Sequence, residues 1–95
     1  MPAYVIARVN VTDPDQYEKY KALSPGAIAA YGGRFIVRGG ETEVLEGEPE
    51  ARRVVVVEFP SMEQARTFYD SPEYREARAA RAGAAEGQFL LVDGV

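Results

Sequence analysis

Four consecutive valines, Val54 to Val57, lie within an apolar run from Arg53 to Phe59. Successive side chains of a strand point to opposite faces, so an apolar run of this kind is typical of a central strand covered on both faces. Helices can cover one face of such a sheet, and a second layer is then required on the other. The chain therefore has to build a sheet with both faces occupied.

Apolar spacing and capping residues predict the other elements. Strands are predicted at Ala3–Asn10, Arg34–Gly39, Arg53–Phe59 and Gln88–Asp93, with a short strand-like piece at Thr42–Glu46. Helices are predicted to begin at Asp13-Pro14-Asp15-Gln16, Ser61-Met62-Glu63-Gln64 and Ser71-Pro72-Glu73-Tyr74, and to end near Gly32, Tyr69 and Ala85. In the first helix, Ser24-Pro25-Gly26 predicts a kink or a restart, because proline removes a backbone donor.

The order strand, helix, strand, strand, helix, strand predicts an α+β fold of the ferredoxin-like split βαβ type, as one domain over residues 1–95. In that arrangement both helices cover one face of an antiparallel sheet and leave the other face bare. The bare face carries several apolar residues, and the simplest cover for it is a second copy of the chain. We therefore expect a homodimer, with two sheets facing one another in an α+β barrel.

Composition excludes several kinds of site. The chain has no cysteine and no histidine, so it has no disulfide, no thiolate metal site and no imidazole ligand or base. We expect neither a metal nor a cofactor.

The net charge of -4 argues against a nucleic-acid partner, and no apolar segment is long enough to span a membrane. The start Met1-Pro2-Ala3-Tyr4 leads directly into a strand without a signal-peptide pattern, so a cytoplasmic location is expected.

Ionisable residues gather on one side of the predicted strands, at Arg8, Arg34, Arg38 and Glu58. With the first and third full strands expected side by side and parallel, Arg8, Arg34 and Glu58 should meet at one end of the sheet. A carboxylate between two guanidinium groups stays ionised. Glu58 could then orient a substrate or act as a base, while Arg8 and Arg34 stabilise a carboxylate or an enolate. The alternative is a ladder of interstrand ion pairs inside the dimer, with a purely structural role.

Tyrosines supply further candidates for ligand binding. Tyr17, Tyr20 and Tyr31 recur along the first predicted helix. A phenol in a dry cleft can donate a hydrogen bond to an oxyanion, although aromatic residues at helical spacing more often pack in a core. Tyr4 lies on the charged strand face and is the better pocket candidate of the set. We take these four tyrosines and Arg38 as candidate ligand-binding residues.

Arginines recur on the last predicted helix at Arg75, Arg78 and Arg81, with acidic residues between them. Such a pattern is typical of a solvated helix face with intrahelical ion pairs. We expect no anion site there.

Five segments together resemble the bacterial family catalogued as domain of unknown function 1330: Pro2-Ala3-Tyr4-Val5-Ile6, Tyr31-Gly32-Gly33-Arg34-Phe35, Arg38-Gly39-Gly40, Val57-Glu58-Phe59-Pro60 and Ser71-Pro72-Glu73-Tyr74. The resemblance implies the dimeric α+β barrel superfamily, which also contains proteins similar to antibiotic-biosynthesis monooxygenases and to muconolactone isomerase. It transfers no activity. Because the histidine of the haem-ligating relatives is absent, haem binding through histidine is excluded.

We therefore expect a homodimeric protein that binds a small anionic or oxygenated organic molecule between its sheet and helices. If it is an enzyme, cofactor-independent proton transfer or oxygenation of the isomerase or monooxygenase kind fits best. The alternative is a non-catalytic dimerisation module with an ion-paired barrel interior. A cavity of at least about 300 Å³ beside Arg8 and Glu58 would favour the first, and a filled interface the second.

Overall fold

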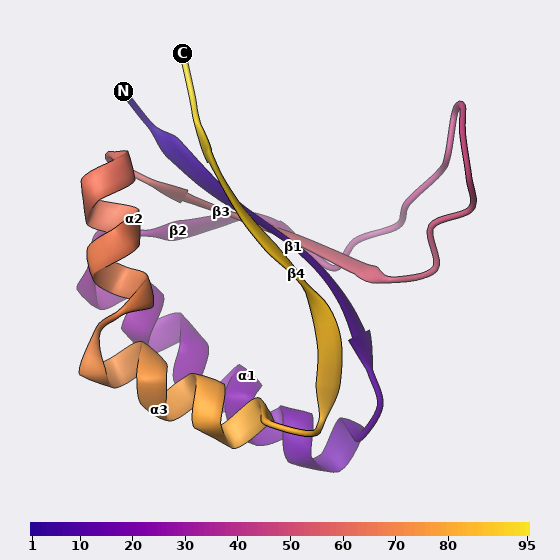
Figure 1. The fold of residues 1–95 in the computed structure, drawn as a ribbon, viewed down its shortest axis with the longest axis horizontal. Coiled ribbons are helices and arrows are strands. Elements are labelled where there is room, and N and C mark those ends of the chain that lie inside the picture. Colours follow the sequence, from indigo (N-terminus) through magenta and orange to yellow (C-terminus); the bar gives the residue numbers. More distant parts are fainter.

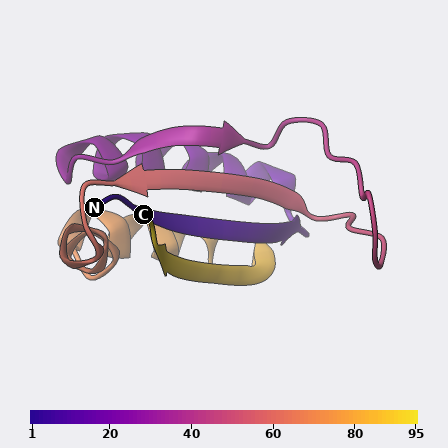
Figure 2. The same cartoon turned by 90° about the horizontal axis from the view of Figure 1, so that it is seen from above.

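A computed structural model describes all residues 1–95 as a four-stranded sheet with helices packed on one of its faces (Figures 1 and 2). The elements are β1 (Ala3–Val11), α1 (Pro14–Ala30), β2 (Arg34–Arg38), β3 (Arg53–Phe59), α2 (Met62–Tyr69), α3 (Pro72–Arg81) and β4 (Ala85–Asp93). The strand order is β2-β3-β1-β4, and every neighbouring pair is antiparallel. This is the ferredoxin-like split βαβ arrangement, so the predicted fold class is confirmed. None of the helices combines the length and the apolar character that a membrane span requires.

The helices begin at the positions that the capping residues indicated. In each case the amide three residues beyond the cap donates to the cap side chain: Gln16 to Asp13 (3.2 Å), Gln64 to Ser61 (3.1 Å) and Tyr74 to Ser71 (3.1 Å). α1 continues through Pro25 as a single helix, so the predicted restart does not occur. Since proline has no N–H, the carbonyl of Lys21 lacks its usual intrahelical donor at that point.

Two boundaries and one element differ from the prediction. α3 ends at Arg81, and β4 begins at Ala85, because Gly83 turns the chain with a φ of 78°. The predicted strand at Thr42–Glu46 is absent, and the chain between β2 and β3 forms an irregular loop that projects past the end of the sheet (Figure 2). A strand requires a hydrogen-bonded neighbour, and this projecting segment has none.

The direction of β1 corrects the predicted cluster of charges. β1 runs antiparallel to β3, not parallel to it, because the crossover through α1 makes β1 parallel to β2 and inserts β3 between them in the opposite direction. Arg8 therefore pairs with Val54 at one end of β3, whereas Glu58 pairs with Tyr4 at the other end. The expectation that Arg8 and Glu58 meet is wrong.

β2 contains a bulge that reverses the faces on which its last two side chains lie. The register runs Phe35↔Val57, Val37↔Val56 and Arg38↔Val55. Ile36 is thus an extra residue, and the side chains after it point to the faces opposite to those that simple alternation predicts. Arg38 was expected on the charged face and Val37 on the helix face, and both placements are wrong: Arg38 lies on the helix side and Val37 on the other.

The core lies between the sheet and the helices and contains closely packed aromatic rings. Phe59 is fully buried, its ring centroid lies 4.8 Å from that of Phe68, and Phe68 lies 4.3 Å from Tyr74. Gly33 lies against this cluster, because a Cβ there would come within 2.6 Å of the Phe59 ring and 2.8 Å of Ile28. Only glycine fits at this position without moving the core.

No helix covers the other side of the sheet, which we call the open face. Its side chains are Tyr4, Ile6, Arg8, Asn10, Arg34, Ile36, Val37, Val54, Val56, Glu58, Glu86, Gln88, Leu90 and Val92. Several of the apolar residues are well exposed, among them Ile36 at 46% and Leu90 at 45%. An apolar surface spread over all four strands is unusual for an isolated small protein and indicates an interaction surface.

Two glycine substitutions should change stability in opposite directions. Gly33→Ala should lower the free energy of unfolding by about 1–3 kcal/mol, because the added methyl overpacks the core at Phe59. Gly26→Ala should raise it by about 0.5–1 kcal/mol, because Gly26 lies inside α1 with no atom near its missing Cβ. Urea unfolding followed by circular dichroism measures both values, and equal effects of the two variants would contradict the packing described for Gly33.

Candidate functional site

A cavity of about 50 Å³ lies between the sheet and the helices. Twelve of its 16 lining residues are hydrophobic. The strand wall includes Val5, Ala7 and Val9 of β1 and Val55 and Val57 of β3. Because a water molecule requires about 10–15 Å³ on this measure, the cavity has room for a few waters or a small ligand group.

α1 supplies hydroxyl groups to this cavity through Tyr17, Tyr20 and Ser24, which lie on its buried face. Tyr17 and Ser24 are each only 5% exposed, and neither hydroxyl has a hydrogen-bond partner in the protein. The Tyr20 hydroxyl is instead paired with that of Tyr74 at 2.7 Å. A hydroxyl without a partner in the protein can donate to or accept from a bound molecule, so these two are available to a ligand.

Tyr17 and Tyr20 stay protonated at neutral pH. Burial raises the pKa of Tyr17, and the nearby charges of Arg53 and Arg81 offset only part of that effect. Burial also raises the pKa of Tyr20, and its contact with Tyr74 raises it further. These phenols can therefore act as hydrogen-bond donors toward an anion.

Two arginines border the cavity from the strands. The guanidinium carbon of Arg38 lies 4.2 Å from the centroid of the Phe35 ring, and Arg53 lies beside Gly39. Gly39 has a φ of 71°, and a Cβ there would come within 2.5 Å of the Arg53 guanidinium carbon, so glycine leaves the space that this group occupies. Neither arginine forms an ion pair, although Lys21 at the same cavity pairs with Glu18 at 3.2 Å.

Both arginines of the open face are paired within the chain. Arg34 Nε donates to Glu58 Oε1 at 3.0 Å, as adjacent positions on β2 and β3 allow. This half of the predicted charge cluster is therefore formed. Arg8 takes no part in it and binds at the other end of the sheet.

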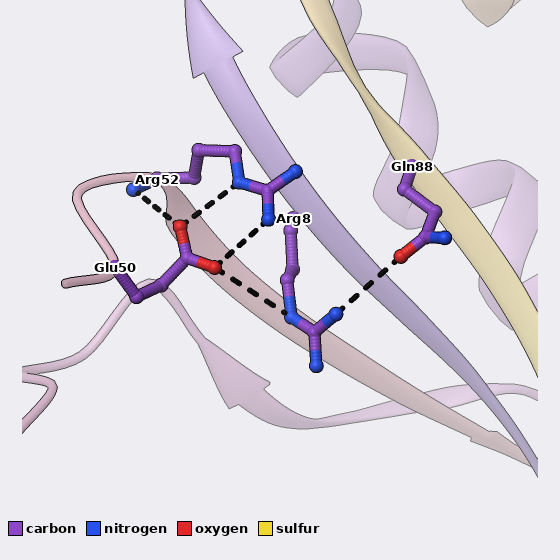
Figure 3. Close-up of polar contacts among 4 residues, drawn as sticks. All are labelled: Arg8, Glu50, Arg52 and Gln88. Atoms are coloured by element: carbon purple, nitrogen blue, oxygen red, sulfur yellow. Dashed lines mark hydrogen bonds and ion pairs between the residues drawn. The ribbon is translucent and has the colours of Figure 1, made fainter. Parts of the chain in front are cut away.

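Arg8 belongs to a second polar cluster, in which residues from three segments meet (Figure 3). Its Nε lies 3.8 Å from Glu50 Oε2, and its Nη1 donates to Gln88 of β4 at 3.4 Å. Glu50 also accepts two hydrogen bonds of 2.9 Å from the guanidinium of Arg52. Hydrogen bonds from Arg52 lower the pKa of Glu50 to about 2, so this carboxylate stays ionised near neutral pH. The cluster fixes the end of the projecting loop to the sheet.

The predicted site residues thus fall into three places. Tyr17, Tyr20 and Arg38 line the cavity, whereas Tyr4, Arg8, Arg34 and Glu58 lie on the open face. Tyr31 is in neither place, because its hydroxyl donates to Glu73 of α3 at 3.0 Å.

Sequence reasoning missed Lys21, Ser24, Arg53 and Tyr74 as cavity residues. Two of them carried a usable signal. Ser24 follows Tyr17 and Tyr20 on the same helix face, and Arg53 alternates with the helix-facing valines of β3.

The arginines of α3 do not all lie on the solvated helix face that the sequence predicted. Arg75 is exposed, but the guanidinium of Arg78 lies 4.3 Å from the ring centroid of Tyr69, and that of Arg81 lies 4.4 Å from Phe89. Long cationic side chains can bury their stems and stack their charged ends on aromatic rings. Charge spacing along a helix does not reveal which rings lie beside it.

Comparison with known proteins shows one family and several structural relatives. The family described as a domain of unknown function, DUF1330, matches residues 2–95, and no curated protein matches the sequence. A protein of unknown function from Rhodopseudomonas palustris has a TM-score of 0.77 at 21% identity, covering 99% of this chain and 82% of that one. SnoaB from Streptomyces nogalater, a cofactor-independent oxygenase, has a TM-score of 0.70 at 16% identity, with 99% and 93% covered. A dimeric ferredoxin-like protein of unknown function from Thermobifida fusca has a TM-score of 0.66 at 22% identity, with 99% and 92% covered.

Identities of 16–22% establish a shared fold and nothing more. That fold agrees with the strand order described above. The family match extends over nearly the whole sequence and includes all five segments on which the resemblance was based. The chain therefore belongs to the DUF1330 family.

Proposed function

We propose that the cavity between the sheet and the helices binds a small anionic or oxygenated organic molecule. The observation that carries this proposal is that Arg38 and Arg53, two guanidinium groups without an ion-pair partner, lie at the border of a mostly apolar cavity. A carboxylate or an enolate is the natural partner of such groups. The free hydroxyls of Tyr17 and Ser24 supply further hydrogen bonds from the helix side.

Catalysis is a further part of this proposal. An enolate or another oxyanion that forms in the cavity would be stabilised by Arg53 and by a hydrogen bond from the Tyr17 phenol. This chemistry suits a proton transfer from the bound molecule to water, or an oxygenation in which dioxygen supplies the oxygen and accepts the electrons, without a cofactor. The similarity in fold to a cofactor-independent oxygenase is compatible with it but assigns no activity, since one fold hosts many functions.

For Arg8, Arg34 and Glu58 we propose the structural alternative instead of a catalytic role. Both arginines have carboxylate partners within the chain, and the cavity lies on the opposite side of the sheet from all three residues. Their pairing allows partly exposed charges to remain in a surface that becomes covered. The open face would then serve dimerisation while the helix side binds the ligand.

We also propose that the open face joins two copies of the chain as a homodimer. The apolar side chains of the open face, which are exposed on β2 and β4 and half-buried on β1 and β3, support this arrangement. The dimeric state named for the Thermobifida fusca relative supports it as well. A symmetric pair of sheets would bury the same patch on both copies. It would also cover the second face of the valine-rich β3.

The ligand proposal predicts that carboxylates stabilise the protein through the cavity arginines. In a thermal-shift screen of small carboxylates, enols and phenolic acids, a ligand at 100 times its dissociation constant should add about 2.7 kcal/mol to the stability of the wild type. Arg53→Gln should weaken binding of the same compound by about tenfold or more, because a charge-assisted hydrogen bond is lost. Isothermal titration calorimetry measures both affinities.

Arg34→Gln is the matched control, since it removes an exposed guanidinium from the open face and leaves the cavity unchanged. Equal losses in Arg53→Gln and Arg34→Gln would place the anion elsewhere. No response from any compound would favour the non-catalytic dimerisation module.

The dimer proposal predicts a molar mass of about twice the 10.4 kDa of the chain in light scattering at micromolar concentration. Leu90→Glu should shift this mass toward the monomer, because it places a charge in the open face. Leu23→Glu, on the outer side of α1 and of comparable exposure, should leave the dimer intact. A wild-type monomer, or equal effects of the two variants, would contradict the facing-sheet arrangement.

A further inference from the structure

A second depression, a groove of about 240 Å³, lies between α2 and the β1–β4 side of the sheet. Its walls are apolar, formed by Val5 of β1, Ala65 and Tyr69 of α2, and Phe89 and Leu91 of β4. Arg66 and Asp70 are the two charged residues that line it, and both are exposed. The groove is more open to solvent than the cavity and offers an apolar ligand a ready-made surface.

The groove and the cavity are neighbours that share two wall residues. Val5 and Phe89 line both of them, from adjacent strands on the helix side of the sheet. Their side chains therefore form the partition between the two spaces. Phe89 is only half-buried, and its ring is held under the Arg81 guanidinium, 4.4 Å away. A stacking contact of this kind is weak enough for the ring to change rotamer when a ligand offers better contacts.

The sizes of the two spaces indicate how they are used. The cavity holds only a few non-hydrogen atoms, which is enough for a carboxylate or a similar oxyanion beside Arg53 but too little for the rest of most organic acids. The groove adds a much larger apolar volume on the far side of Phe89. With the partition displaced, the combined space reaches the lower end of the range of about 300–1,000 Å³ that is typical of small-molecule sites.

We propose that the cavity and the groove form one site for an amphipathic organic acid, whose oxyanion binds at Arg38 and Arg53 and whose apolar chain or ring passes Phe89 into the groove. This inference rests on the proposed function of the cavity and specifies the class of its ligand. The polar end meets the cations and free hydroxyls, and the apolar end meets Tyr69 and Leu91. A small fully polar anion would use only the cavity.

Chain-length dependence tests the inference. Calorimetric titration of straight-chain carboxylates from acetate to decanoate should show affinity rising by up to about fourfold for each methylene that is buried, until the groove is full. Leu91→Trp, which fills the groove, should end this rise at a shorter chain. Phe89→Ala should raise the affinity for long acids relative to acetate, because the partition is removed.

Leu23→Trp, on the outer side of α1, is the control for adding an indole and should reproduce the wild-type profile. If acetate binds through Arg53 but affinity does not rise with chain length, the inference is wrong and the proposed anion site stands. If Leu91→Trp leaves the profile unchanged, the apolar end lies elsewhere and the inference is again wrong. If no acid binds at any length, the inference is wrong, and so is the proposed anion site at Arg38 and Arg53.

Discussion

The antiparallel pairing of β1 with both β3 and β4 determines the rest of the structure. β1 lies inside the sheet, and its register decides which side chains of the outer strands share a face and which ends they occupy. That register separates Arg8 from Glu58 and brings Arg8 to Gln88 instead. It also aligns the helix-facing residues of β1 with those of β3 and β4, so that one continuous apolar wall supports both the cavity and the groove.

The arginines on the two sides of the sheet differ in whether they have a carboxylate partner. On the open face, Arg8 and Arg34 have carboxylate neighbours, and a paired charge can be covered at a lower cost than a free one. On the helix side, Arg38 and Arg53 have none, and their charge remains available to a molecule from solution. The same residue type thus has a structural role on one side and a proposed binding role on the other.

The sequence predicted much of the fold because the relevant signals are local. N-caps at Asp13, Ser61 and Ser71 specify where helices start, and their order with the strands specifies the topology. The site was harder to predict because it depends on pairing between distant segments. Arg38 was assigned to the wrong face, since alternation within one strand cannot show an extra residue that only the partner strand defines. The single domain and the cytoplasmic location stay predictions.

The bulge at Ile36 decides which faces the last two residues of β2 occupy. If Ile36 itself paired with Val56, Val37 would lie opposite Val55 on the helix side, and the Arg38 side chain would return to the open face. One of the two unpaired arginines would then leave the border of the cavity, and an apolar group would take its place, with no amino acid substituted. A change of pairing along β2 is therefore enough to convert a cavity border that suits acids into one that suits neutral molecules.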